Sequence, residues 1–111
     1  MPKVVVFYKL KSGATMKQYE KFSREIDQMI TPKMKVVEKF EVFQVTDYVQ
    51  GSSKPEKKNP PFEIFEIIDV KDFADWIKTT QSDAFKKVVD GWGKVGDGAT
   101  LVMLGGKKIE K

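Results

Sequence analysis

Apolar and polar positions alternate along the chain in two different periods, and together they predict four strands and two helices. Short runs rich in Val, Ile and Phe favour β-strands. These runs lie at residues 4–10, 36–49, 62–70 and 100–104. Between the first two runs, apolar residues recur every three or four positions, as on one face of a helix. A second helical stretch begins near Phe73, breaks between Thr80 and Ser82, and continues to Trp92.

The first helix has clear boundary signals and is expected over residues 15–30. Thr15 and Gln18 have the spacing of a capping box, and Pro32 ends the helix. The predicted apolar stripe contains Met16, Tyr19, Phe22, Ile26, Met29 and Ile30. The opposite, polar side is expected to contain Lys17, Glu20, Lys21, Glu25, Asp27 and Gln28.

The order of elements, β-α-β-β-α-β, is typical of a ferredoxin-like α+β sandwich. We therefore expect residues 1–111 to form a single domain, with a four-stranded antiparallel sheet and helices on one face. The strands are apolar on both parities, since Val4 and Val6 alternate with Val5 and Phe7. Strands of this kind are usually covered on both faces. One layer of helices covers only one face, so we expect a homodimer that pairs through the sheet faces.

Two glutamates interrupt the third apolar run. Glu63 and Glu66 are three residues apart, so in a strand they point to opposite faces. We assign Glu66 to the helix side, where burial would raise its pKa and suit it to general acid or base catalysis. The alternative is a structural ion pair. Glu63 is assigned to the dimer side or its rim, where we expect an ion pair, and a bulge in the strand would exchange the two roles.

Composition limits the chemistry and the partners. The chain has no Cys and no His, which excludes thiol nucleophiles, zinc sites built from these residues, and histidine relays. The net charge is +4, and Lys54, Lys57 and Lys58 cluster in a predicted loop at residues 50–61. No nucleic-acid-binding motif accompanies them, so we expect a solvated lysine surface. No run approaches a membrane helix, and no signal peptide is visible; a cytoplasmic location is expected.

Three segments carry a resemblance to the dimeric α+β-barrel superfamily, and most of all to the RedY-like proteins of prodigiosin-type tripyrrole pathways. They are VVVFYKLKSG at residues 4–13, VFQVTDYVQG at 42–51 and PPFEIFEIIDVKDFADWI at 60–77. The resemblance covers nearly the whole chain. It implies two subunits paired through their sheets, each holding an aromatic, heterocyclic biosynthetic intermediate between the helices and the concave sheet face. Haem-binding relatives use an axial His, which this chain lacks, and we expect neither a cofactor nor a metal.

Several side chains are candidates for such a ligand site. Glu66 and Tyr8 are the expected catalytic pair, because Tyr8 ends a strand that should lie beside the strand of Glu66. Trp76 could stack on a planar ligand. The other predicted substrate-binding residues are Tyr48, Tyr19, Phe22 and Trp92. For each aromatic residue the alternative is core packing. Arg24 could bind an acidic group, although a surface ion pair is the simpler interpretation.

Three functions are compatible with these patterns. The first is a small biosynthetic enzyme that catalyses cyclisation, dehydration or cofactor-free oxidation of an aromatic intermediate. The second is a ligand-binding or accessory protein without chemistry of its own. The third is a basic nucleic-acid-associated module, which the lysine cluster at residues 54–58 and the net charge support and which we rank last.

Overall fold

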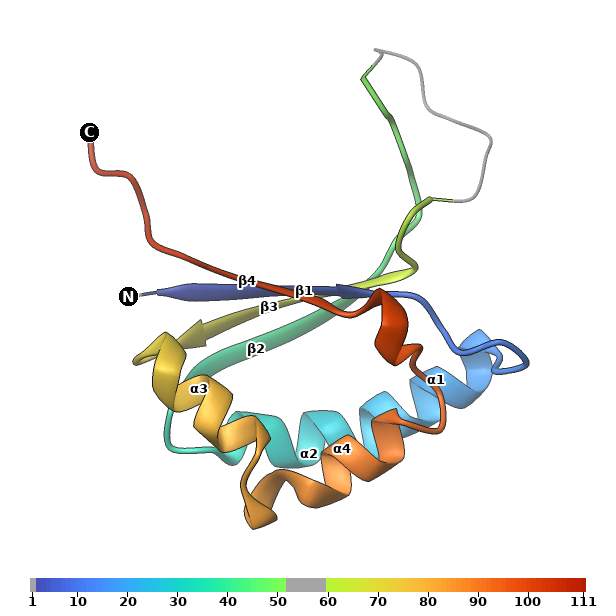
Figure 1. Cartoon of the computed structure of the whole chain (residues 1–111), viewed down its shortest axis with the longest axis horizontal. Helices are drawn as coiled ribbons and strands as arrows, with labels where there is room; N and C mark the ends of the chain where they lie inside the picture. The colour runs from blue at the N-terminus through green and yellow to red at the C-terminus, as the bar shows by residue number, and fades with distance from the viewer. Residues whose placement is uncertain (1, 52–59) are drawn as a thin grey trace.

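A computed structural model describes residues 2–51 and 60–111 as a four-stranded antiparallel sheet with helices (Figure 1). The strands are β1 (Lys3–Tyr8), β2 (Val37–Gln44), β3 (Ile64–Val70) and β4 (Val102–Gly106). The helices are α1 (Met16–Phe22), α2 (Gln28–Ile30), α3 (Phe73–Thr80) and α4 (Lys86–Trp92). The strand order is β2-β3-β1-β4, and every neighbouring pair is antiparallel. The predicted ferredoxin-like fold is therefore confirmed.

All the helices lie on the same side of the sheet, as Figure 1 shows. The core lies between these two layers. Its buried apolar side chains include Val4, Val6, Tyr8, Tyr19, Ile64, Ile68, Val70, Trp76, Phe85 and Val88. On β1 and β3 the buried positions alternate with partly exposed ones, which is the period of two expected of a strand.

The opposite sheet face is largely apolar, and none of the described helices covers it (Figure 1). In one row across the sheet, Phe43, Phe65, Phe7 and Val102 are paired partners on successive strands. In the next row the partners are Glu41, Ile67, Val5 and Leu104. Phe43 stacks on Phe65 with 4.9 Å between ring centroids, and Leu104 remains 55% exposed. This surface, called the open face below, is a contiguous apolar patch of the kind that marks interaction sites.

The second strand is shorter than the predicted run of residues 36–49, and the prediction was wrong at its end. The last β2–β3 pair joins Gln44 to Ile64, and one further hydrogen bond runs from the Val45 amide to the Glu63 carbonyl. Because β3 begins at Ile64, residues 46–49 have no paired partner there, and this segment projects from the sheet (Figure 1). β2 also contains an irregularity near its start, seen as a register shift between Val37 and Lys39 in its pairing with β3.

The first helical region is interrupted where the sequence predicts a continuous helix. The capping box of Thr15 and Gln18 starts α1 as predicted, but Ser23–Asp27 forms a π-helical turn before α2 begins. A π turn inserts an extra residue, so the side chains after it rotate around the helix axis. The predicted faces are therefore wrong at two positions beyond Phe22, whereas Ile26 and Ile30 pack against the core as predicted. Met29, expected in the apolar stripe, is 54% exposed, whereas Asp27, expected on the polar side, is 4% exposed.

The second helical region follows the prediction more closely. Asp72 caps α3 by accepting a hydrogen bond from the amide of Asp75. The predicted break follows at Gln81 and Ser82, and a 3₁₀ turn at Asp83–Phe85 leads into α4. No helix within residues 2–51 and 60–111 is long and apolar enough to cross a membrane.

Candidate functional site

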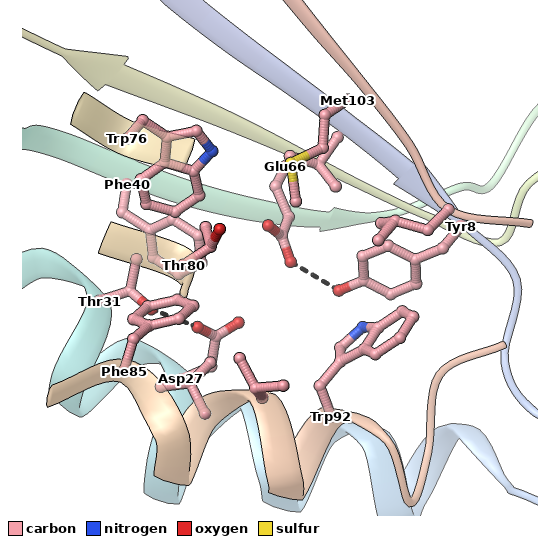
Figure 2. Close-up of a pocket in the computed structure, with 14 residues that line it drawn as sticks. Tyr8, Asp27, Thr31, Phe40, Glu66, Trp76, Thr80, Phe85, Trp92 and Met103 are labelled. Carbon is pink, nitrogen blue, oxygen red and sulfur yellow. Dashed lines mark hydrogen bonds between the residues drawn. The ribbon is translucent and has the colours of Figure 1, made fainter. Parts of the chain in front are cut away.

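A cavity of about 270 Å³ lies between the sheet and the helices. Side chains from β1, β2, β3 and β4 form one wall, and side chains from α3, α4 and the π turn form the other (Figure 2). The lining is mainly apolar. It consists of Val6, Tyr8, Asp27, Thr31, Phe40, Glu66, Trp76, Thr80, Phe85, Val88, Val89, Trp92, Leu101 and Met103.

Glu66 enters this cavity from the middle of β3. It shares the inward parity of Ile64 and Ile68, as the alternation of β3 predicts, and is 7% exposed. The Tyr8 hydroxyl donates a hydrogen bond to Oε2 of Glu66 at 2.6 Å. The Tyr19 hydroxyl lies 2.6 Å from that of Tyr8. Because Tyr8 has a single hydroxyl proton, it accepts from Tyr19 while it donates to Glu66. The result is a buried chain of three hydrogen-bonding groups that ends at the cavity.

The surroundings of Glu66 favour its protonated form. Burial in the apolar cavity, followed by repulsion from the nearby Asp27 carboxyl, raises the pKa of Glu66 to about 8. The hydrogen bond from Tyr8 opposes this shift. Burial, followed by the charge of Glu66, also raises the pKa values of both Tyr8 and Tyr19. Both phenols are therefore hydrogen-bonding groups at neutral pH, and neither is a phenolate nucleophile.

Asp27 is the second carboxyl group in the cavity, and the sequence analysis missed it. The π turn directs it inward, where its Oδ1 accepts a hydrogen bond from the Thr31 hydroxyl at 2.5 Å. Burial raises the pKa of Asp27 to about 6, and the bond from Thr31 opposes the shift. Figure 2 shows the carboxyl groups of Asp27 and Glu66 directed into the cavity from opposite walls. At neutral pH this acid pair combines one ionised and one protonated carboxyl group, hence a base and an acid.

A sequence signal for Asp27 did exist. Tyr19, Ser23, Asp27 and Thr31 are spaced four residues apart, and all four are buried. A polar series at helical spacing that continues from a buried tyrosine indicates an inward-facing polar stripe.

The aromatic walls depend on close packing. Trp76 packs edge-on against Phe85, with ring centroids 5.8 Å apart, and Trp92 packs edge-on against Tyr8 at 5.1 Å. Gly96 permits the position of Trp92, because a Cβ at residue 96 would lie 2.2 Å from the indole ring. Trp76 is 2% exposed, and its Nε1 has no hydrogen-bond partner among the described residues.

Four of the predicted site residues line the cavity together: Glu66, Tyr8, Trp76 and Trp92. Tyr19 contacts the site only through the Tyr8 hydroxyl. The remaining two lie outside the lining. Phe22 faces Gly91 on α4 within the core, and the Tyr48 hydroxyl donates to Gln50 on the segment that leaves the sheet. Tyr48 was expected near the cavity because β2 was predicted to continue through it.

The other charged candidates, Glu63 and Arg24, make contacts outside the cavity. Oε1 of Glu63 accepts a hydrogen bond from the Leu10 amide at 2.9 Å, which is a backbone contact in place of the expected ion pair. Arg24 and Glu20 form an exposed pair, one helical turn apart and 3.6 Å between charged atoms, as the surface interpretation predicted. The lysine cluster at residues 54–58 lies outside the described residues. In residues 2–51 and 60–111, no group of three or more acidic side chains could ligate a metal ion.

Comparisons with known proteins agree with this fold. The chain superposes on the crystal structure of HapK from Hahella chejuensis with a TM-score of 0.75 and 18% identity, covering 100% of this chain and 95% of that one. An EthD family protein from Bacillus halodurans matches with a TM-score of 0.67 and 16% identity, covering 98% and 99% of the two chains. A dimeric ferredoxin-like protein of unknown function from Bacteroides fragilis matches with a TM-score of 0.63 and 12% identity, covering 96% of this chain and 95% of that one.

Sequence comparison identifies the family. No curated protein sequence matches the chain significantly. The family model described as REDY-like protein HapK, however, matches residues 2–108, nearly the whole chain, in agreement with the resemblance seen in its strands. The chain therefore belongs to the RedY-like HapK family.

Proposed function

We propose that this protein acts in the cytoplasm in secondary metabolism, where it binds an aromatic or heterocyclic intermediate in the cavity and catalyses an acid–base step on it. The observation that carries the proposal is the acid pair of Asp27 and Glu66 in an otherwise apolar cavity. Buried carboxyl groups with pKa values shifted toward neutrality are typical of catalytic acids and bases. Family membership supports a secondary-metabolism role.

The roles of the two carboxyl groups follow from their protonation states. Glu66, protonated at neutral pH, donates a proton to a ligand oxygen, and Asp27, ionised, accepts a proton from the ligand. Tyr8 positions Glu66 through its hydroxyl, and Trp92 and Phe85 offer apolar surface to a planar ring. A dehydration or a cyclisation requires only these groups. They therefore favour such a reaction over a cofactor-free oxidation, which also requires oxygen.

Turnover of a panel of heteroaromatic carbonyl and hydroxyl compounds tests this proposal. Wild-type protein is compared with Glu66→Gln and with the matched control Glu63→Gln, whose carboxylate accepts a backbone hydrogen bond outside the cavity. We expect turnover to fall 100-fold or more in Glu66→Gln, in the usual range for loss of a general acid, and to stay within about threefold in Glu63→Gln. Equal rates in wild type and Glu66→Gln would exclude Glu66 from catalysis.

A binding function without chemistry is the second candidate. The mainly apolar lining, which contains no Cys or His, supports it. In this case native mass spectrometry would detect a retained aromatic ligand in both wild type and Glu66→Gln, without product formation by either.

We further propose that two copies pair through the open face. The two rows on this face, apolar at every position except Glu41, support the pairing, and so does the similarity to a ferredoxin-like protein described as dimeric. Light scattering at micromolar concentration should give twice the chain mass of 12.7 kDa, and a monomer would contradict this part of the proposal.

A further inference from the structure

The charged groups that line the cavity are carboxyl groups, and this bears on the charge of a ligand that could bind there. Asp27 and Glu66 offer carboxyl oxygens from opposite walls. No lysine or arginine is among the described residues that line the cavity. The titratable groups that face Glu66 are Tyr8 from β1, Asp27 from the π turn and, through Tyr8, Tyr19 from α1; α3, α4 and β4 contribute only uncharged side chains to the lining.

Trp76 supplies an independent observation. Its indole Nε1 is a hydrogen-bond donor only, and it is buried without a partner among the described residues. Figure 2 shows this nitrogen on the edge of the ring turned toward Glu66. A buried donor without an acceptor is unfavourable, and buried polar groups in native proteins nearly always have partners. An acceptor atom on a ligand would satisfy it.

We propose that the cavity binds a planar aromatic ligand whose cationic N–H group lies between Asp27 and Glu66 and whose acceptor atom faces Nε1 of Trp76. This inference rests on the second candidate above, ligand binding without chemistry, in which Glu66 is not a general acid, and it specifies the ligand class. An anion would meet two carboxyl groups with no lining cation, which is unfavourable in an apolar cavity. A cation compensates the charge of the acid pair, and its N–H groups satisfy the carboxyl oxygens.

Three planar probes of nearly equal size test the charge preference: benzamidine, benzamide and benzoate. Isothermal titration calorimetry of the wild-type protein at pH 7 should show benzamidine binding at least tenfold more tightly than benzamide, and benzoate most weakly. Asp27→Asn should weaken benzamidine binding tenfold or more and leave benzamide within about twofold. The matched control is Asp90→Asn, which removes the same charge from the exposed surface of α4 and should change neither affinity.

Proton release provides a second readout that a merely structural acid pair would not produce. A bound cation lowers the pKa of Glu66, so a carboxyl group protonated at pH 7 loses its proton on binding. Titrations in buffers of different ionisation enthalpy should detect release of about one proton per benzamidine, and Glu66→Gln should abolish it.

A fourth probe, 4-carbamoylbenzamidine, tests the role of Trp76. Its carbonyl oxygen lies at the end opposite the amidine, and we expect it to bind about tenfold more tightly than benzamidine. Trp76→Phe keeps an aromatic ring but removes the donor, so this advantage should disappear. If benzamide and benzamidine bind equally well, the inference about ligand charge is wrong while the aromatic site stands. If none of the planar probes binds, the proposed binding function itself fails.

Discussion

Adjacent residues of β3 face opposite sides of one sheet and have different surroundings. Ile68 points toward the helices and is 0% exposed, whereas Ile67 lies on the open face and remains partly exposed. Both faces are rich in Val, Ile and Phe. The helix face, however, also encloses two carboxyl groups and a phenol chain, while the charged pair of Lys3 and Asp69 on the open face remains accessible to solvent.

The difference between the two sheet faces separates the apolar positions that build the fold from those that remain available for association. The helix face is covered within one chain, so its polar groups are desolvated and acquire shifted pKa values. The open face stays partly exposed to solvent, and an apolar patch of this kind is typical of association surfaces. We therefore assign chemistry to the helix face and association to the open face.

The largest expected effect is on the free energy of unfolding, and it distinguishes Ile68 from Ile67. Ile68→Ala removes a fully buried side chain and should lower the free energy of unfolding by about 2–5 kcal/mol. Ile67→Ala should have less than half that effect when unfolding is measured at concentrations where the protein is monomeric, because Ile67 is then partly solvated. Urea unfolding checks both variants, and equal losses would remove the distinction between the faces.

Dimerisation should depend on the open face, in contrast to the stability of the single chain, which depends mainly on the helix face. Phe65→Asp places a charge in the centre of the open face and should weaken dimerisation 100-fold or more, which corresponds to about 2.7 kcal/mol. Analytical ultracentrifugation measures this change. The control, Gln81→Asp, adds the same charge at an exposed position after α3 and should leave the dimer intact. A stable Phe65→Asp dimer would place the interface elsewhere.

The pH dependence of stability tests the buried acid on the helix face. The pKa of Glu66 is raised from 4.5 to about 8, so protonation stabilises the folded protein; this contribution is complete below pH 4.5 and is lost as the pH rises to 8. Glu66→Gln lacks the contribution. As the pH rises, the unfolding free energy of wild type should therefore fall relative to that of the variant, by at most about 1.4 kcal/mol per pH unit. Chemical denaturation between pH 6 and 8 measures this difference, and parallel curves would contradict it.

The most local effect concerns the packing of the cavity wall. Gly96→Ala forces the indole of Trp92 to move and should lower stability by about 1–3 kcal/mol. The fluorescence of Trp92 should shift as its ring leaves Tyr8. Gly98→Ala is the matched control, because its added Cβ would lie 4.0 Å from the same indole. Similar losses in the two variants would show that the close approach at Gly96 is unimportant.

Much of the fold could be predicted from the sequence because local signals agree with one another. The capping box at Thr15 and the strand alternation of β3 depend on neighbouring residues, and both are present. The end of β2 could not be predicted in this way. It depends on where β3 begins, and pairing between distant strands leaves no local signature.

The site was predicted in part for the same reason. Alternation within β3 placed Glu66 toward the helices, and the structure places it there. Asp27 was assigned to the wrong face because the sequence was interpreted with a constant helical period, and the π turn changes that period. The position of Trp92 depends on a glycine four residues later, whose role becomes visible only when the two are packed together.

The central claim is that Glu66 is a protonated acid inside the cavity at neutral pH. Carbon-13 NMR of glutamate carboxyl groups, with the Glu66 signal assigned by its loss in Glu66→Gln, titrates this group directly. The account predicts a Glu66 midpoint well above the ordinary 4.5 and near 8, coupled to a second transition from Asp27 near 6. A single midpoint near 4.5 would show that Glu66 is an ordinary ionised carboxylate and would contradict the account.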